Sequence, residues 1–212
     1  MSVSLELVRR SQRSRLFAVL SPLLALVVTI VAGAAMFAYL GKPPLTGLYT
    51  YFVEPLTQMW SLHELAVKAA PLILIAVGLS VCFQSSNWNI GAEGQLIAGG
   101  IAGSILPIMF PDVAGAFVLP AMLLMAMVGG ALFGCIPALL KTRFNTNEIL
   151  VSLMLVYVAQ LFLDWLVRGP WRNPEGFNFP ESRQFHADAI LPEMLPELGR
   201  AHWGFVLALA AA

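Results

Sequence analysis

Residues 16–41 read LFAVLSPLLALVVTIVAGAAMFAYLG, and none of these 26 side chains carries a charge. A helix needs about 20 mainly apolar residues to cross roughly 30 Å of hydrocarbon. Residues 69–92 and 113–140 are also long enough and free of charge, and residues 94–111 and 149–163 need only modest extension. The sequence therefore predicts an all-α, polytopic integral membrane helix bundle with five spanning helices. Their expected bounds are residues 16–40, 66–83, 92–110, 113–140 and 149–167.

The composition agrees with a membrane protein. Of the 212 residues, 58% are hydrophobic and 11% are charged, and the mean hydropathy is +0.79. A soluble domain carries about 25% charged residues, so a soluble globule of this composition is excluded. The net charge of zero gives no electrostatic basis for binding nucleic acid. Cys82 and Cys135 lie in apolar runs and are expected to be small buried hydrophobic residues rather than metal ligands.

Two segments outside the five runs bear on the domain organisation. A sixth apolar run opens at Trp203 and continues to Ala212, which is too short to span a bilayer. We therefore expect residues 1–212 to be the N-terminal portion of one transmembrane domain, truncated within an element. Residues 168–202 have soluble character, with five prolines and five acidic side chains. They are expected to form an extracytoplasmic loop that caps the bundle, and this loop is also a candidate docking surface for a soluble partner.

The distribution of Lys and Arg near the helix ends predicts the orientation. Four arginines precede the first run, at positions 9, 10, 13 and 15, and Lys141 and Arg143 lie in a short loop after the fourth. An even number of expected crossings separates the two groups. We therefore expect a multi-pass protein of the cell membrane whose N-terminus and 141–148 loop are both cytoplasmic.

Glycines spaced four apart predict close packing between helices. Gly99 and Gly103 form one such pair, and Gly130 and Gly134 form another. Small residues at this spacing let helix backbones approach closely in membranes. Packing within the chain is the favoured interpretation, and a subunit interface is the alternative.

A polar stretch, QSSNWNIGAEGQ at residues 84–95, interrupts the apolar pattern. Asn, Ser and Gly weaken a helix, and a break at membrane depth must be buried in protein or line a watery cavity. The alternative is an ordinary interfacial loop. We expect Asn87, Asn89, Glu93 and Gln95 to lie on or beside a solute pathway near the bilayer interior. For Glu93, pairing with open backbone amides at a helix start is favoured over contact with the solute.

Residues 89–95, NIGAEGQ, match the F-N-I-G-A-E-G-Q signature of ABC-importer permeases of the nucleoside and simple-sugar type. Residues 140–150, LKTRFNTNEIL, resemble the L-K-x-R-F-x-x-N-E loop of the same group. Two motifs in the right order make the resemblance specific. The chain thus resembles a permease of the branched-chain amino acid and ribose permease superfamily. Trp88 and Val156 depart from the usual pattern, in which Phe and Asn occupy these positions.

The resemblance implies a set of partners and no cofactor in this chain. Such a permease works with a second permease subunit, a cytoplasmic ABC ATPase and an extracytoplasmic substrate-binding protein. ATP hydrolysis then belongs to the ATPase, and the sequence contains no Gly-x-x-x-x-Gly-Lys-Ser/Thr loop. The implied cargo is a small polar solute, first of all a nucleoside and next a simple sugar.

The residues of the 141–148 loop also predict a local structure without the family resemblance. Asn145 is expected to cap the following helix while Glu148 reaches back, as in a capping box. Contact with other subunits is the second interpretation. The residues proposed for that contact are Arg143, Asn145, Asn147 and Glu148.

Two other classes of protein, an enzyme and a secondary transporter, share some of these sequence features. For an enzyme, His63-Glu64 begins a zinc-binding H-E-x-x-H motif, but Val67 stands at the position of the second histidine. No catalytic or metal-ligating set remains. An ion-coupled secondary transporter is the stronger alternative, because broken helices and a carboxylate at membrane depth also suit ion coupling.

Overall fold

The computed structural model describes residues 15–177, 179–195, 197 and 199–212. Arg9, Arg10 and Arg13, on which the expected orientation partly depends, lie outside these residues. The chain divides into two compact units, residues 1–62 and 63–212. Among the described residues the regular structure is helical, and five helices are long and apolar enough to cross a membrane. The prediction of an all-α bundle with five spanning helices is therefore confirmed.

The first unit holds the spanning helix α1 (Arg15–Tyr39) and the short helices α2 (Pro44–Phe52) and α3 (Glu54–Thr57). The helices α2 and α3 were not predicted from the sequence. Pro44 stands at the first position of α2, where its lack of an N–H removes no helical hydrogen bond. Gly47 of α2 lies against the ring of Phe37 in α1, with 2.9 Å between an ideal Cβ on the glycine and the ring carbons.

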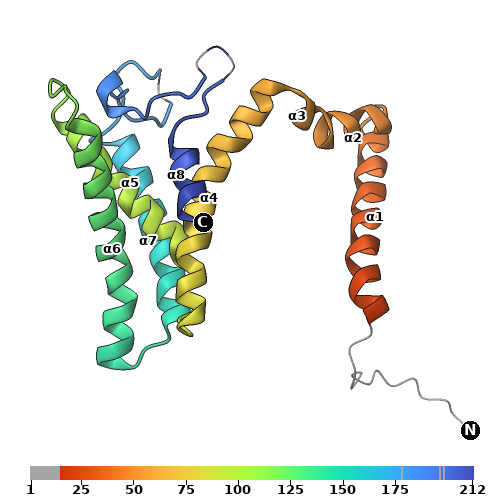
Figure 1. Cartoon of the computed structure of the whole chain (residues 1–212), viewed down its shortest axis with the longest axis horizontal. Coiled ribbons are helices and arrows are strands. Elements are labelled where there is room, and N and C mark those ends of the chain that lie inside the picture. Colours follow the sequence, from red (N-terminus) through yellow and green to blue (C-terminus); the bar gives the residue numbers. More distant parts are fainter. Residues whose placement is uncertain (1–14, 178, 196, 198) are drawn as a thin grey trace, which may run out of the picture. The chain divides into compact units, whose positions relative to one another are not determined.

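The second unit contains α4 (Met59–Gln84), whose first turn belongs to the first unit, and α5 (Ala92–Met109), α6 (Val118–Phe144) and α7 (Glu148–Arg168). It ends with the 3₁₀ turn η1 (Ala187–Ala189) and α8 (Gly204–Ala211). α5 contacts both α6 and α7, and α6 also contacts α7 (Figure 1). The sixth apolar run was expected to begin a further helix, and α8 confirms this prediction.

Two expected helix starts were wrong by more than one turn. α4 begins at Met59 rather than at residue 66, because the helix continues through Glu64, a charged residue that lies before the apolar run of residues 69–92. α6 begins at Val118 rather than at residue 113. Gly115 adopts a φ of +132°, which few other residues tolerate, and its N–H donates to Asp188 Oδ2 over 2.7 Å instead of entering a helix.

The glycine pairs bring α5 and α6 into backbone contact. An ideal Cβ on Gly99 would lie 2.8 Å from the carbonyl oxygen of Ala126, and one on Gly103 would lie 3.0 Å from that of Met122. From the other side, a Cβ on Gly130 would lie 3.2 Å from the carbonyl oxygen of Gln95. The glycines therefore serve packing within the chain, as the favoured interpretation held.

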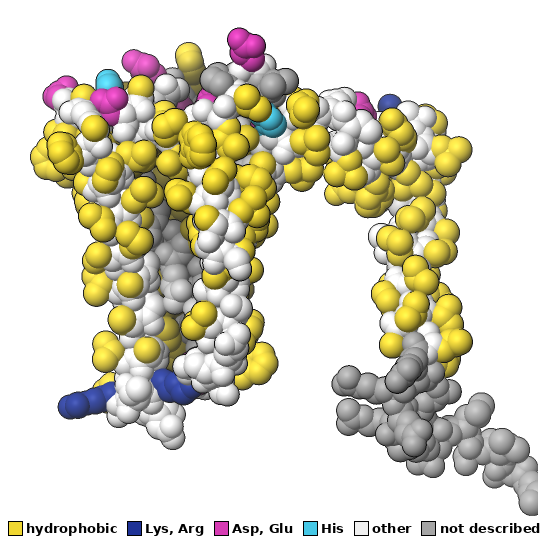
Figure 2. Space-filling model, viewed as in Figure 1, with side chains coloured by type: hydrophobic (Ala, Val, Ile, Leu, Met, Phe, Trp, Pro, Cys, Tyr) yellow, Lys and Arg dark blue, Asp and Glu magenta, His cyan; other side chains and the backbone are white. Residues whose placement is uncertain are grey.

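The segment after α7 covers one end of the bundle (Figure 1). Trp171 is buried beside Leu166 and Ile108, which anchors the start of the segment on α7 and α5. Near its end, the Arg200 guanidinium donates to both carboxylate oxygens of Glu64 in α4, each over 2.9 Å. Figure 2 shows acidic side chains gathered at this end, above a mostly hydrophobic band. The segment therefore caps the bundle, which is the structural part of what the sequence predicted for residues 168–202.

Candidate functional site

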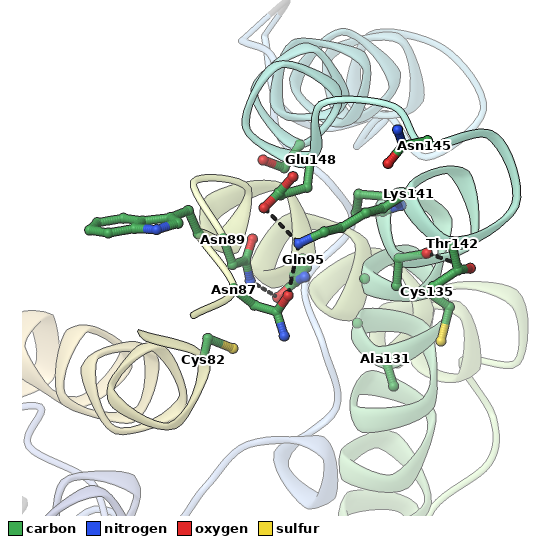
Figure 3. A pocket seen from close by; sticks show the side chains of 16 residues that line it. Cys82, Asn87, Asn89, Gln95, Ala131, Cys135, Lys141, Thr142, Asn145 and Glu148 are labelled. Carbon is green, nitrogen blue, oxygen red and sulfur yellow. Dashed lines mark hydrogen bonds and ion pairs between the residues drawn. The ribbon is translucent and has the colours of Figure 1, made fainter. Parts of the chain in front are cut away.

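A cavity of about 750 Å³ opens near the opposite end of the second unit. Its walls come from the end of α4, the non-helical residues 85–91, the start of α5, the second half of α6 and the start of α7 (Figure 3). The helix break predicted near residues 84–95 is thus confirmed, limited to residues 85–91. The two motifs of the sequence analysis, far apart in the chain, form one site. The predicted residues that line it are Asn87, Asn89, Gln95, Asn145 and Glu148.

Two amides are joined inside the cavity. Asn89 Nδ2 donates to Gln95 Oε1 over 3.2 Å, while Asn89 Oδ1 accepts the N–H of Gly91 over 2.9 Å. The second bond holds the turn that leads into α5. A Cβ at Gly134 would lie only 2.6 Å from Gln95 Nε2. A larger residue at position 134 would therefore collide with the Gln95 amide, and glycine avoids this. Asn89 therefore shapes the backbone and also orients a polar group of the cavity.

A second polar group surrounds Lys141. Its ammonium donates to Glu148 Oε1 over 2.7 Å and to Asn87 Oδ1 over 3.1 Å (Figure 3). The Lys141 and Glu148 side chains are 37% and 25% exposed. Because the two charges pair, the cavity holds neutral amides and one ion pair with no net charge. Lys141 was not among the predicted site residues, although it belongs to the L-K-x-R-F pattern.

Glu93 does not line this cavity. It lies in the first turn of α5, and its Oε1 accepts a hydrogen bond of 2.9 Å from Gln160 Nε2 of α7. The expectation that Glu93 pairs with open backbone amides was therefore wrong. Gln160 stands twelve residues after Glu148 and eight before Arg168, so this polar pair meets α7 near the middle of a membrane-spanning helix. Both side chains are exposed in this chain, so the depth expected for Glu93 stays a prediction.

The capping box predicted for residues 145–148 was also wrong. Asn145 closes α6 instead of opening α7: it adopts the left-handed conformation (φ 52°, ψ 37°), and its N–H donates to the carbonyls at the end of α6. Asn147 is the N-cap of α7, where its Oδ1 accepts the N–H groups of Ile149 and Leu150 at 3.0 and 3.3 Å. Neither Arg143 nor Asn147 lines the cavity.

The two cysteines were misjudged as well. Cys82 of α4 is half-buried, Cys135 of α6 is exposed, and both line the cavity (Figure 3). Their apolar sequence neighbours carried no signal of this, because the rotation of each helix about its axis decides which side chains face inward. Both thiols are free, so they can report access to the cavity.

Apolar helices around a neutral polar cavity describe a polytopic membrane protein with room for a small solute. Comparison with known proteins narrows this further. The chain belongs to the branched-chain amino acid transport system / permease component family, whose sequence profile matches residues 61–212. The match covers the whole second unit, including the cavity and the segment that caps the bundle.

Several curated permeases are similar to this chain. The glucose ABC transporter permease protein TsgB13 of Haloferax volcanii is 36% identical, over 100% of this chain and 57% of its own length. The nucleoside ABC transporter permease protein NupB of Lactococcus lactis is 32% identical, over 73% of this chain and 43% of its own. The guanosine ABC transporter permease protein NupP of Bacillus subtilis is 28% identical, over 93% and 57%. The chain thus spans about half the length of these relatives. No solved structure matches the chain significantly.

Proposed function

We propose that this chain is part of a membrane-spanning permease subunit of an ATP-driven importer, and that its cavity belongs to the pathway of a small uncharged polar solute. A nucleoside or a simple sugar fits best. The observation that carries this proposal is the cavity lining, in which Asn87, Asn89 and Gln95 present amides and the charges of Lys141 and Glu148 cancel. Amides both donate and accept hydrogen bonds, which suits the hydroxyls of a sugar and the base edges of a nucleoside.

The size and the surroundings of the cavity support the same class of solute. Its volume of about 750 Å³ lies within the range of small-molecule sites in proteins. Trp88 adds an aromatic ring to the lining, on which a base or a sugar face can stack. The relatives' names, which specify glucose, nucleosides and guanosine, point to the same two solute classes. A second permease subunit, a cytoplasmic ATPase and an extracytoplasmic binding protein complete the proposed importer.

Uptake by the assembled importer tests this function. The full permease is reconstituted with its ATPase and binding protein, and the entry of labelled glucose and guanosine into proteoliposomes is measured. We expect uptake of at least one of the two to require ATP hydrolysis and to persist when ionophores collapse all ion gradients. Uptake that proceeds without ATP and stops with the ionophores would instead identify an ion-coupled secondary transporter.

Reporter tags test the orientation. The 145–147 loop and the 169–203 segment lie at opposite ends of the second unit, so the membrane should separate them (Figure 1). We expect tags at residues 5 and 144 to report cytoplasmic and a tag at residue 185 to report extracytoplasmic. A cytoplasmic signal at residue 185 would reverse the orientation and would remove the capping segment as a candidate docking surface for the binding protein.

A further inference from the structure

The Lys141 ammonium connects three parts of the cavity wall: α6, the 85–91 segment and α7. Lys141 extends from α6, and its ammonium binds Asn87 of the 85–91 segment and Glu148 at the start of α7. Among the described residues, the bond to Asn87 is the only hydrogen bond that links the 85–91 segment to α6 or α7. The far end of the segment is fixed by packing, because a Cβ on Gly91 would lie 2.8 Å from the Cβ of Ser152 in α7. The hydrogen-bonded attachment of residues 85–89 to α6 thus depends on a single flexible side chain.

Lys141 stands between the inner amides and the nearest end of the bundle. Gln95 meets α6 at Gly134, and Lys141 follows seven residues later, about 10 Å further along the helix axis. α6 ends three residues beyond, at Phe144. The Lys141 contacts therefore lie between the level of Gln95 and this end of the bundle.

The contacts around Lys141 are well suited to open and close. Both charged side chains are partly exposed, and ion pairs with access to water contribute little net stability. The Asn87 amide is exposed, so water can replace its bond to Lys141. Each charge also sits at a helix end that favours it, the cation near the C-terminus of α6 and the carboxylate at the N-terminus of α7. The Lys141–Glu148 pair is therefore held in place while the Asn87 contact can exchange.

We propose that Lys141 is a positioning residue that narrows the mouth of the cavity at this end by holding residues 85–89 through Asn87, and that release of this contact widens the way for a solute. The proposal rests on the permease function proposed above. It assigns to Lys141 control over access to the cavity, which differs from direct recognition of the solute.

The native thiols measure this access. Cys82 lies near the end of α4, close to the 85–91 segment, and is half-buried in the cavity wall, whereas Cys135 is exposed with the Lys141 contacts in place. In full-length permease carrying Cys135→Ser, we expect Lys141→Met to raise the reaction rate of Cys82 with small water-soluble methanethiosulfonates about tenfold. That factor corresponds to about 1.4 kcal/mol in the equilibrium between the held and the released contact. The reagent is applied to opened membranes, so that it reaches both faces.

Three comparisons make the result specific. A cationic and an anionic reagent are both used, because a purely electrostatic effect of removing Lys141 would move their rates in opposite directions. Lys141→Arg keeps a cation with several donors and should leave both rates within about twofold of the parent. Arg143→Met removes a positive charge two residues away, outside the cavity lining, and should leave both rates unchanged.

The outcomes separate this inference from the proposed function. Rates that rise for both reagents in Lys141→Met and return in Lys141→Arg support the proposed role of Lys141. Unchanged rates, or opposite shifts for the two reagents, would overturn it. The measurement needs no transport, so a failure of uptake in the assembled importer would count against the proposed function alone.

Discussion

Leucine in place of Gly99 is expected to destabilise the packing of α5 on α6 by about 3 kcal/mol, the upper end of the usual range for adding bulk to a packed interior. A Cβ at this position would already lie 2.8 Å from the backbone carbonyl oxygen of Ala126. A backbone atom cannot swing aside as a long side chain can, so the two helices would have to separate. The measurement is the midpoint of thermal unfolding of the purified permease in detergent, together with the yield of folded protein.

Gly100 provides a matched control one residue away. Nothing lies within 4 Å of the Cβ that a substitution would add there. Leucine has a higher helix propensity than glycine, by nearly 1 kcal/mol. We therefore expect Gly100→Leu to leave the unfolding midpoint unchanged or to raise it slightly. Equal losses at both positions would show that the close α5–α6 approach does not depend on Gly99.

The sequence predicted the spanning helices because length and absence of charge are requirements of the bilayer itself. The expected start of α4 was wrong, because Glu64 lies within the helix, where its carboxylate pairs with Arg200, a residue 136 positions later. Asn145 and Asn147 were confused for a related reason. Asparagine favours both the left-handed end of one helix and the N-cap of the next, and only the folded chain decides between them.

Residues 84–95 also show which parts of a site can be predicted from the sequence and which parts need the folded structure. Asn87, Asn89 and Gln95 line one cavity, and their place on a solute pathway stays a prediction. Glu93 and Gln95 lie two residues apart in one helix, and positions two apart do not share a face. Helical geometry alone could thus have separated Glu93 from the cavity. The partner of Glu93 on α7 and the role of Lys141 required the tertiary structure, because they join residues distant in sequence.

Substitution of Asn89 is expected to separate the two roles of this side chain. Asn89→Asp keeps the oxygen that accepts the Gly91 N–H, so the turn into α5 and the yield of folded protein should remain close to the parent. It replaces the Nδ2 donor by a second oxygen, which faces Gln95 Oε1 and favours rotation of the Gln95 amide toward the new carboxylate. The Gln95 donor is then no longer free for the solute, and we expect uptake to fall about tenfold or more, equivalent to about 1.4 kcal/mol.

Asn89→Leu removes both bonds and should have the larger effect. The Gly91 N–H and the Gln95 oxygen lose their partner in a partly buried site, at a cost of about 1–3 kcal/mol for each group left unsatisfied. We therefore expect a lower unfolding midpoint and uptake at background level. Ile90→Ala, at an exposed neighbour outside the cavity lining, serves as the control and should transport at close to the parent rate. Parent-level uptake by Asn89→Asp would restrict Asn89 to holding the turn, and a normal yield of stable Asn89→Leu would remove that role too.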